Sequence, residues 1–203
     1  MAVAQDVLSD LAGCSAMGSF YANVTVVGAG LEAVKEVLAG SGDHLAAVGD
    51  DVVVFSAGHE TPLGGDEIAI RLATALSVPV VDVSVYDSDY AVIHVVSRAG
   101  ELAAAATAPP SGAEIMGEMG ADPDEIPGAG LTTSETAAAL VAAVGRGDAA
   151  KVKLALEADN VFADESHHGI FAALDLPTVG VGWGHRTLEE DRELFDAVPL
   201  VTA

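Results

Sequence analysis

Residues 78–96 read VPVVDVSVYDSDYAVIHVV, and this stretch decides the fold class. Two runs rich in β-branched residues, Val78 to Tyr86 and Tyr90 to Val96, flank the triplet Asp87-Ser88-Asp89. β-branched and aromatic residues favour strands, and a short Asp/Ser link favours a tight reversal of the chain. The stretch therefore predicts a β-hairpin.

The residues before this hairpin predict another strand, a second hairpin and two helices. Phe20 to Val27 is rich in β-formers, and Leu31 to Leu38 repeats its apolar residues at helical spacing. A Gly/Asp turn inside residues 45–55 predicts the second hairpin, and residues 65–76 return to helical spacing. The order βαββαββ predicts an α/β protein of the α+β kind, with a mixed, largely antiparallel sheet and two helices on one face.

The remaining residues predict a smaller, mainly helical part. We expect an edge strand or a short helix over 98–108, and a loop or linker with a short helical turn at most over the Pro- and Gly-rich residues 109–130. Further on, the sequence predicts helices from Thr133 or Ser134 to Val144, from Gly147-Asp148 to Leu156 and from Asp164 to Leu174, a short strand at Val179–Trp183 and a last helical turn or two over 188–195. The predicted units are an extension at 1–18, a sheet domain at 19–108, a linker at 109–130 and a helical part at 131–203.

The charge balance restricts the classes of partner. The chain of 203 residues carries 31 acidic and 8 basic side chains, a formal charge of -23. Nucleic-acid affinity depends on Lys and Arg neutralising phosphates, so this balance argues against a nucleic-acid partner. Complementary fields accelerate protein encounters, so a basic protein partner fits better. Adaptation of a housekeeping protein to a salty cell explains the same charge and stays open.

The cysteine content and the apolar runs predict a cytoplasmic protein without a membrane segment. Cys14 is the only cysteine, so no internal disulfide can form and nothing argues for an oxidising compartment. Leu11-Ala12-Gly13 before it fits a lipidation pattern, but Met1 to Asp10 carries no basic residue and no unbroken apolar run. No window reaches the roughly 18 apolar residues of a membrane span.

A glycine pattern after the first predicted strand suggests an enzyme as the alternative. Val26-Val27-Gly28-Ala29-Gly30 lies between a strand and a helix, and Asp50 follows about 20 residues later, as in dinucleotide-binding folds. Gly28, Gly30 and Asp50 are therefore the candidate cofactor residues of this alternative. Against it, a strand follows Asp50-Asp51 at once, which leaves no room for a second crossover helix.

The histidines do not form a convincing metal motif in the sequence, and we expect no metal or cofactor. His167 and His168 are the densest pair, but neighbouring side chains on a helix point about 100° apart. Zinc would need further ligands from His44, His59, His94 or His185 through tertiary proximity. Trp183, the only tryptophan, lies in Gly180-Val181-Gly182-Trp183-Gly184 and suggests either packing or an interface anchor.

Several short motifs together resemble an uncharacterised bacterial α/β family that is common in actinobacteria. They are Met17 to Thr25 (MGSFYANVT), Val161-Phe162-Ala163 with His167 or His168, Leu174-Asp175-Leu176-Pro177 and Val181-Gly182-Trp183-Gly184. The chain lacks the aromatic residue that this family usually has near 58–61. The resemblance implies no catalytic residue. At the level of class, small acidic proteins of this kind are similar to immunity proteins that neutralise secreted toxins.

These observations predict a non-enzymatic binding protein, an immunity protein or antitoxin that occludes the active site of a basic toxin. The toxin would be nuclease- or deaminase-like by the same class resemblance. Acidic clusters at predicted loops and helix starts, together with the tryptophan, give the candidate contact residues: Asp87, Asp89, Asp122, Asp124, Glu125, Asp164, Glu165 and Trp183.

Overall fold

The computed structural model describes residues 20–57, 65–109, 111–118, 120, 122, 126, 128–195 and 199–203. The predicted extension at 1–18 and the candidates Asp124 and Glu125 lie outside these residues. The strands are β1 (Tyr21–Val26), β2 (His44–Val48), β3 (Asp51–Phe55), β4 (Val80–Tyr86), β5 (Tyr90–Val96), β6 (Leu102–Ala108) and β7 (Leu200–Thr202). The helices are α2 (Leu31–Val37), α3 (Gly65–Leu76), α4 (Ser111–Glu118), α5 (Thr133–Val144), α6 (Ala149–Leu156), α7 (Ala163–Ala173) and α8 (His185–Asp191), followed by the 3-10 turn η3 (Arg192–Leu194).

The seven strands form one sheet in the order β6-β5-β4-β1-β3-β2-β7, and every described pair is antiparallel. Both predicted hairpins are confirmed, and residues 102–108 resolve the open alternative as a strand beside β5. β1 lies at the centre of the sheet, between β3 and β4, and all six of its residues are buried. The mixed α/β class is confirmed, and the sheet is antiparallel throughout the described residues.

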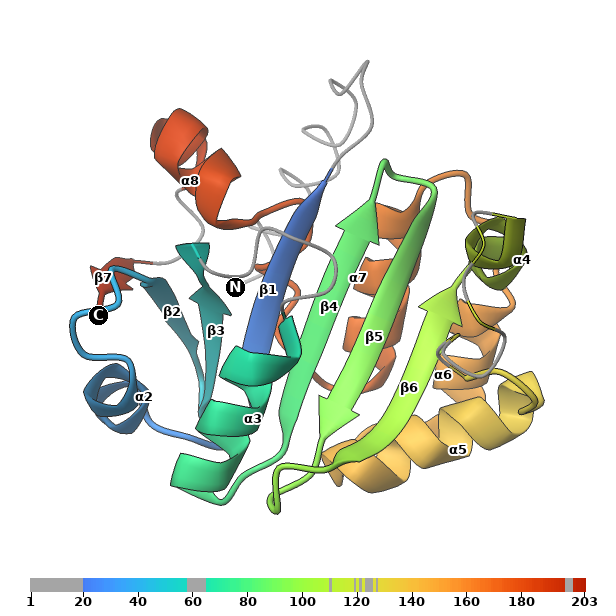
Figure 1. Ribbon diagram of the computed structural model, residues 1–203, viewed down its shortest axis with the longest axis horizontal. Helices are drawn as coiled ribbons and strands as arrows, with labels where there is room; N and C mark the ends of the chain where they lie inside the picture. The colour runs from blue at the N-terminus through green and yellow to red at the C-terminus, as the bar shows by residue number, and fades with distance from the viewer. Residues whose placement is uncertain are drawn as a thin grey trace.

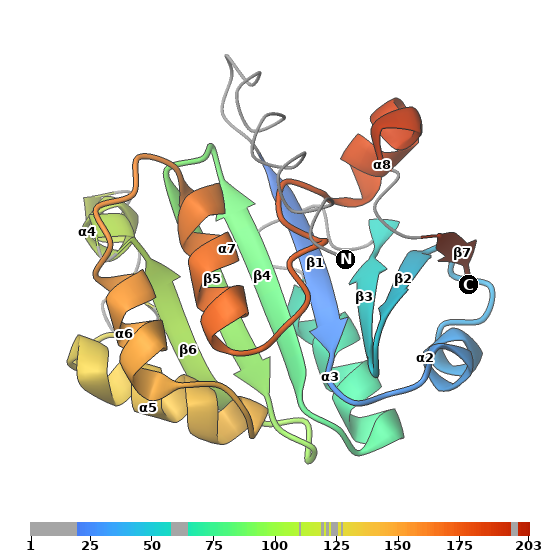
Figure 2. The ribbon, with the colours of Figure 1, turned by 180° about the vertical axis from the view of Figure 1, so that it is seen from behind.

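Helices cover both faces of the sheet (Figures 1 and 2). Successive strand residues point to opposite faces, so Val80 packs with α2 and α3 while Val81 packs with α5, α6 and α7. Apolar side chains of the second layer, such as Leu140 and Phe171, belong to the same core cluster as the sheet residue Ile93. The C-terminal helices therefore share a core with the sheet.

Local sequence signals set the ends of α5 and α6. The Thr132 hydroxyl accepts from the Glu135 amide at 3.3 Å while the Glu135 carboxylate accepts from the Thr132 amide at 2.8 Å, a reciprocal capping box. The cap is thus Thr132, and not Thr133 or Ser134 as the sequence predicts. Gly145 ends α5 in the left-handed region, and the Asp148 carboxylate accepts from the first amides of α6, as its sequence predicts.

Three elements differ from the prediction. Residues 111–118 form an eight-residue helix where a loop with one helical turn at most was expected. Residues 179–183 are turns and not a strand, because Val181 and Trp183 donate to the carbonyls three residues earlier and Gly182 has a φ of 79°. β7 was not predicted, since three residues are too few to show an alternating pattern. Among the described helices, none is long and apolar enough to cross a bilayer.

Candidate functional site

Acidic side chains gather at the end of the sheet where β4 turns into β5. Asp87 and Asp89 are exposed in this turn. The turn is joined to the start of α7, because the Ala163 amide donates to the Ser88 carbonyl at 2.8 Å. This contact places Glu165, which is exposed, and Asp164, which is half-buried, beside the turn. Four predicted contact residues from two separate sequence segments therefore form one surface, which we call the acidic end.

Two large apolar side chains stand exposed at the same place. Val161 is 79% exposed and Phe162 is 50% exposed, and they immediately precede α7. Protein interfaces commonly combine apolar or aromatic anchors with a polar rim. The acidic end has this composition. The prediction from sequence missed both residues as contacts, although an apolar pair placed directly before Ala163-Asp164-Glu165 is a signal that could have marked them.

A buried chain of polar groups fixes α7 beneath this surface. The Tyr21 hydroxyl lies 2.9 Å from Nδ1 of His167, and it also hydrogen-bonds the Asp164 carboxylate. Nε2 of His167 is buried and has no partner among the described residues. An unpaired N–H costs more than an unpaired lone pair, so we assign the proton to Nδ1. His167 then donates to Tyr21, and Tyr21 donates to Asp164.

Burial sets the protonation states of this chain. Burial lowers the pKa of His167 to about 3, with a smaller contribution from His168. Burial and the charge of Asp164 raise the pKa of Tyr21 well above its ordinary value. Burial also raises the pKa of Asp164, the hydrogen bond from Tyr21 opposes this, and Glu165 raises it further. At neutral pH the imidazole is therefore uncharged and the phenol keeps its proton.

The loop between α7 and α8 lies directly on β1. The side-chain amide of Asn23 donates to the carbonyls of Gly180 at 2.7 Å and Trp183 at 3.0 Å. A Cβ at Gly180 would lie 2.8 Å from Oδ1 of Asn23, and one at Gly184 would lie 3.3 Å from the Ala22 amide nitrogen. The glycines permit this close approach. Tyr21-Ala22-Asn23, from the first motif of the family resemblance, and Val181 to Gly184, its last motif, thus lie against each other.

The other predicted contact residues lie in different surroundings. Trp183 is half-buried, and its ring packs edge-on against Phe195 with centroids 5.1 Å apart, so packing is the role that the structure describes for it. Asp122 is exposed. The helical pair His167 and His168 diverges as expected, since one side chain is buried and the other exposed.

The Gly28–Gly30 turn has a different role from the one that a dinucleotide would require. β1 pairs with β3 and β4, both antiparallel, whereas the dinucleotide fold requires parallel strands around a crossover helix. The Gly28 amide donates to Oδ1 of Asp51 at 2.9 Å, and Oδ2 of Asp51 pairs with Arg146. The Asp51 carboxylate thus already accepts from a backbone amide of the turn. Asp50 is exposed in the hairpin between β2 and β3.

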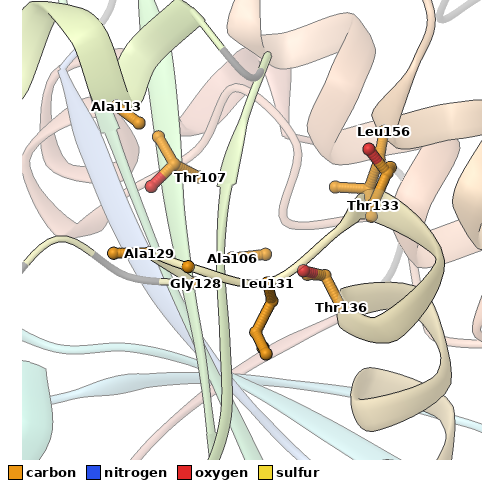
Figure 3. Close-up of a pocket in the computed structure, with 10 residues that line it drawn as sticks. Ala106, Thr107, Ala113, Gly128, Ala129, Leu131, Thr133, Thr136 and Leu156 are labelled. Atoms are coloured by element: carbon orange, nitrogen blue, oxygen red, sulfur yellow. The ribbon is translucent and has the colours of Figure 1, made fainter.

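A pocket beside β6 offers little chemistry. It lies between β6, the loop at 128–131 and the helices α4, α5 and α6 (Figure 3). Its lining has small and apolar side chains with three hydroxyls and no titratable group: Thr107, Leu131, Thr133, Thr136 and Leu156 are the largest members. Thr107 of the pocket pairs with Val92, three residues after Asp89, but none of the lining residues belongs to the acidic end.

Comparison of the chain with models of protein families, with curated proteins and with solved structures finds no match. The resemblance to a bacterial α/β family therefore stays a prediction from sequence motifs.

Proposed function

We propose that the chain is a non-enzymatic binding protein that docks a basic protein partner on the acidic end. The observation that carries the proposal is the hydrogen bond between Ala163 and Ser88, which brings the turn with the exposed Asp87 and Asp89 beside the segment that holds the exposed Phe162 and Glu165. Charges of one sign steer an oppositely charged partner and suppress wrong ones, and a desolvated aromatic residue supplies affinity. The buried Tyr21–His167–Asp164 chain holds this surface in place before binding, which lowers the ordering cost.

The finer proposal is that the partner is a toxin and the chain its cytoplasmic immunity protein. Its support is the formal charge of -23 and the class resemblance of small acidic proteins. A basic nuclease or deaminase presents a positive active-site cleft to its substrate, so an acidic surface can compete for that cleft. The alternative of high-salt adaptation requires no partner, and it is tested in the same experiment.

A pair of charge reversals tests the docking surface. We expect Asp89→Lys/Glu165→Lys to weaken binding to a partner retained from native cells by at least about tenfold, because rim charges change to repulsive ones. The matched control is Glu36→Lys/Glu101→Lys, which changes two exposed acids elsewhere by the same net charge. Affinity is measured by calorimetry at several salt concentrations on variants whose melting temperatures show that they are folded.

The results of these measurements distinguish an immunity protein from a protein adapted to high salt. A basic partner that is toxic when expressed alone and harmless together with this chain supports the immunity proposal. Equal binding by both double variants would show that the acidic end is not the docking surface. If no partner is retained and the melting temperature rises steeply with molar salt, the acidity serves salt adaptation.

A further inference from the structure

Two histidines and a glutamate from distant parts of the sequence meet where α8 crosses the start of β2. His44 is the first residue of β2 and is buried, while His185 and Glu189 lie four positions apart on α8 and so share one helix face. Nε2 of His44 lies 2.5 Å from Oε1 of Glu189, and the two imidazole rings are parallel within 12° at a centroid distance of 5.0 Å. One ligand atom from each residue lies within 4.8 Å of the others.

This set of donors suits a divalent transition metal. Imidazole nitrogen and carboxylate oxygen bind Zn²⁺ at about 2.0–2.2 Å, which places tetrahedral ligands roughly 3.3 Å apart. The widest possible separation of 4.8 Å would therefore have to close by about 1.5 Å, and the 2.5 Å separation of His44 and Glu189 would have to open by about 0.8 Å. His185 is half-buried and Glu189 is exposed, so their side chains have room for this movement, whereas His44 is fixed within the fold.

The surroundings of His44 support the role of a ligand. Its Nδ1 lies 3.5 Å from the Thr202 hydroxyl on β7, and an outer partner of this kind directs the other ring nitrogen toward a metal. Leu188, between the two helical ligands, is completely buried and fixes α8 against the sheet. A histidine–glutamate hydrogen bond alone accounts for His44 and Glu189, but it gives no reason for a second imidazole stacked beside the first.

We propose that His44, His185 and Glu189 bind one Zn²⁺ ion and leave a fourth coordination position open to water. Three protein ligands with an open position are typical of zinc sites that are not purely structural. The ion would connect α8 to β2, the strand next to the edge strand β7 (Figures 1 and 2). The proposal goes beyond the docking function and does not depend on it, because none of the three residues belongs to the acidic end.

Titration of the chelator-treated full chain with Zn²⁺ tests the site. We expect one ion per chain with a dissociation constant in the micromolar range or tighter, and an intense visible absorption when Co²⁺ is added in its place. His185→Gln and Glu189→Gln should each weaken binding by at least about tenfold, as even outer-sphere changes commonly do. His168→Gln is the matched control, since it removes an exposed imidazole from α7.

These variants avoid the buried His44, so a folding defect does not obscure the result, and melting curves without metal verify this. Absence of saturable 1:1 binding to the wild-type chain would overturn the proposal. So would His185→Gln and Glu189→Gln variants that bind Zn²⁺ as tightly as His168→Gln, because the ion would then be held by other residues.

Discussion

Replacing Gly147 by alanine should lower the free energy of unfolding by roughly 3 kcal/mol or more, the largest effect that we expect from a single methyl group. Gly147 has a φ of 99°, and a Cβ there would lie 2.7 Å from Cα of Leu174 and 2.8 Å from the Ala173 carbonyl oxygen. Both neighbours are backbone atoms, so α7 would have to move away from the start of α6. The hydrogen bond from the Asp148 amide to the Ala173 carbonyl, 3.0 Å long, would be disturbed as well.

Gly145→Ala is the matched control for this prediction. Gly145 also has a positive φ, 83°, but an added Cβ would meet nothing within 4 Å. Its substitution should cost only the left-handed backbone strain, about 1–2 kcal/mol. Urea unfolding of both variants measures the difference. Equal losses would show that the contact between the α5–α6 turn and the end of α7 does not limit stability.

Acidification should destabilise the protein through His167. The folded pKa is about 3 against an ordinary value of 6.5, so between these pH values the unfolded chain binds a proton that the folded chain does not. Stability therefore falls as the pH falls below 6.5. At no more than 1.36 kcal/mol per unit, the contribution of this group amounts to about 2 kcal/mol between pH 6.5 and pH 4.5, because the unfolded histidine is only half-protonated at pH 6.5.

The difference between wild type and His167→Asn isolates this contribution, because the many carboxyl groups titrate in both proteins. The asparagine amide can reach Tyr21 from the position of Nδ1 and does not titrate. The free-energy gap between wild type and variant at pH 7 should shrink by about 2 kcal/mol or more on acidification to pH 4.5. His168→Asn, an exposed change, should follow the wild-type profile. A gap that does not vary with pH would mean that His167 titrates normally in the folded protein.

The elements with strong periodicity could be predicted from the sequence, and those that depend on tertiary contacts could not. The two hairpins and the helix at 65–76 carry long apolar patterns, so local physics determines them. The turns at 179–183 do not form a strand, although their apolar residues suggest one: Val179 and Trp183 pack against a cluster that includes Phe55 and Phe195, a contact that spacing does not reveal.

The candidate site shows the same division. Asp87, Asp89, Asp164 and Glu165 could be selected as acidic residues at predicted loop and helix ends, but their proximity depends on one backbone contact between β4–β5 and α7. The contact between His44 and His185 likewise requires α8 to pack beside the start of β2, and no local sequence pattern specifies this packing. Tyr21 looks like an ordinary strand residue until His167, 146 positions away, is placed against it.

The pairing of β7 with β2 has a consequence for synthesis of the protein on the ribosome. Thr202 meets His44 across 158 positions, and translation at about 5–20 residues per second needs roughly 8–30 s to cover that distance. Throughout this interval the outer edge of β2 has unpaired backbone donors and acceptors, which are a template for association with other nascent chains. Repulsion between chains that each carry a high negative charge opposes such association.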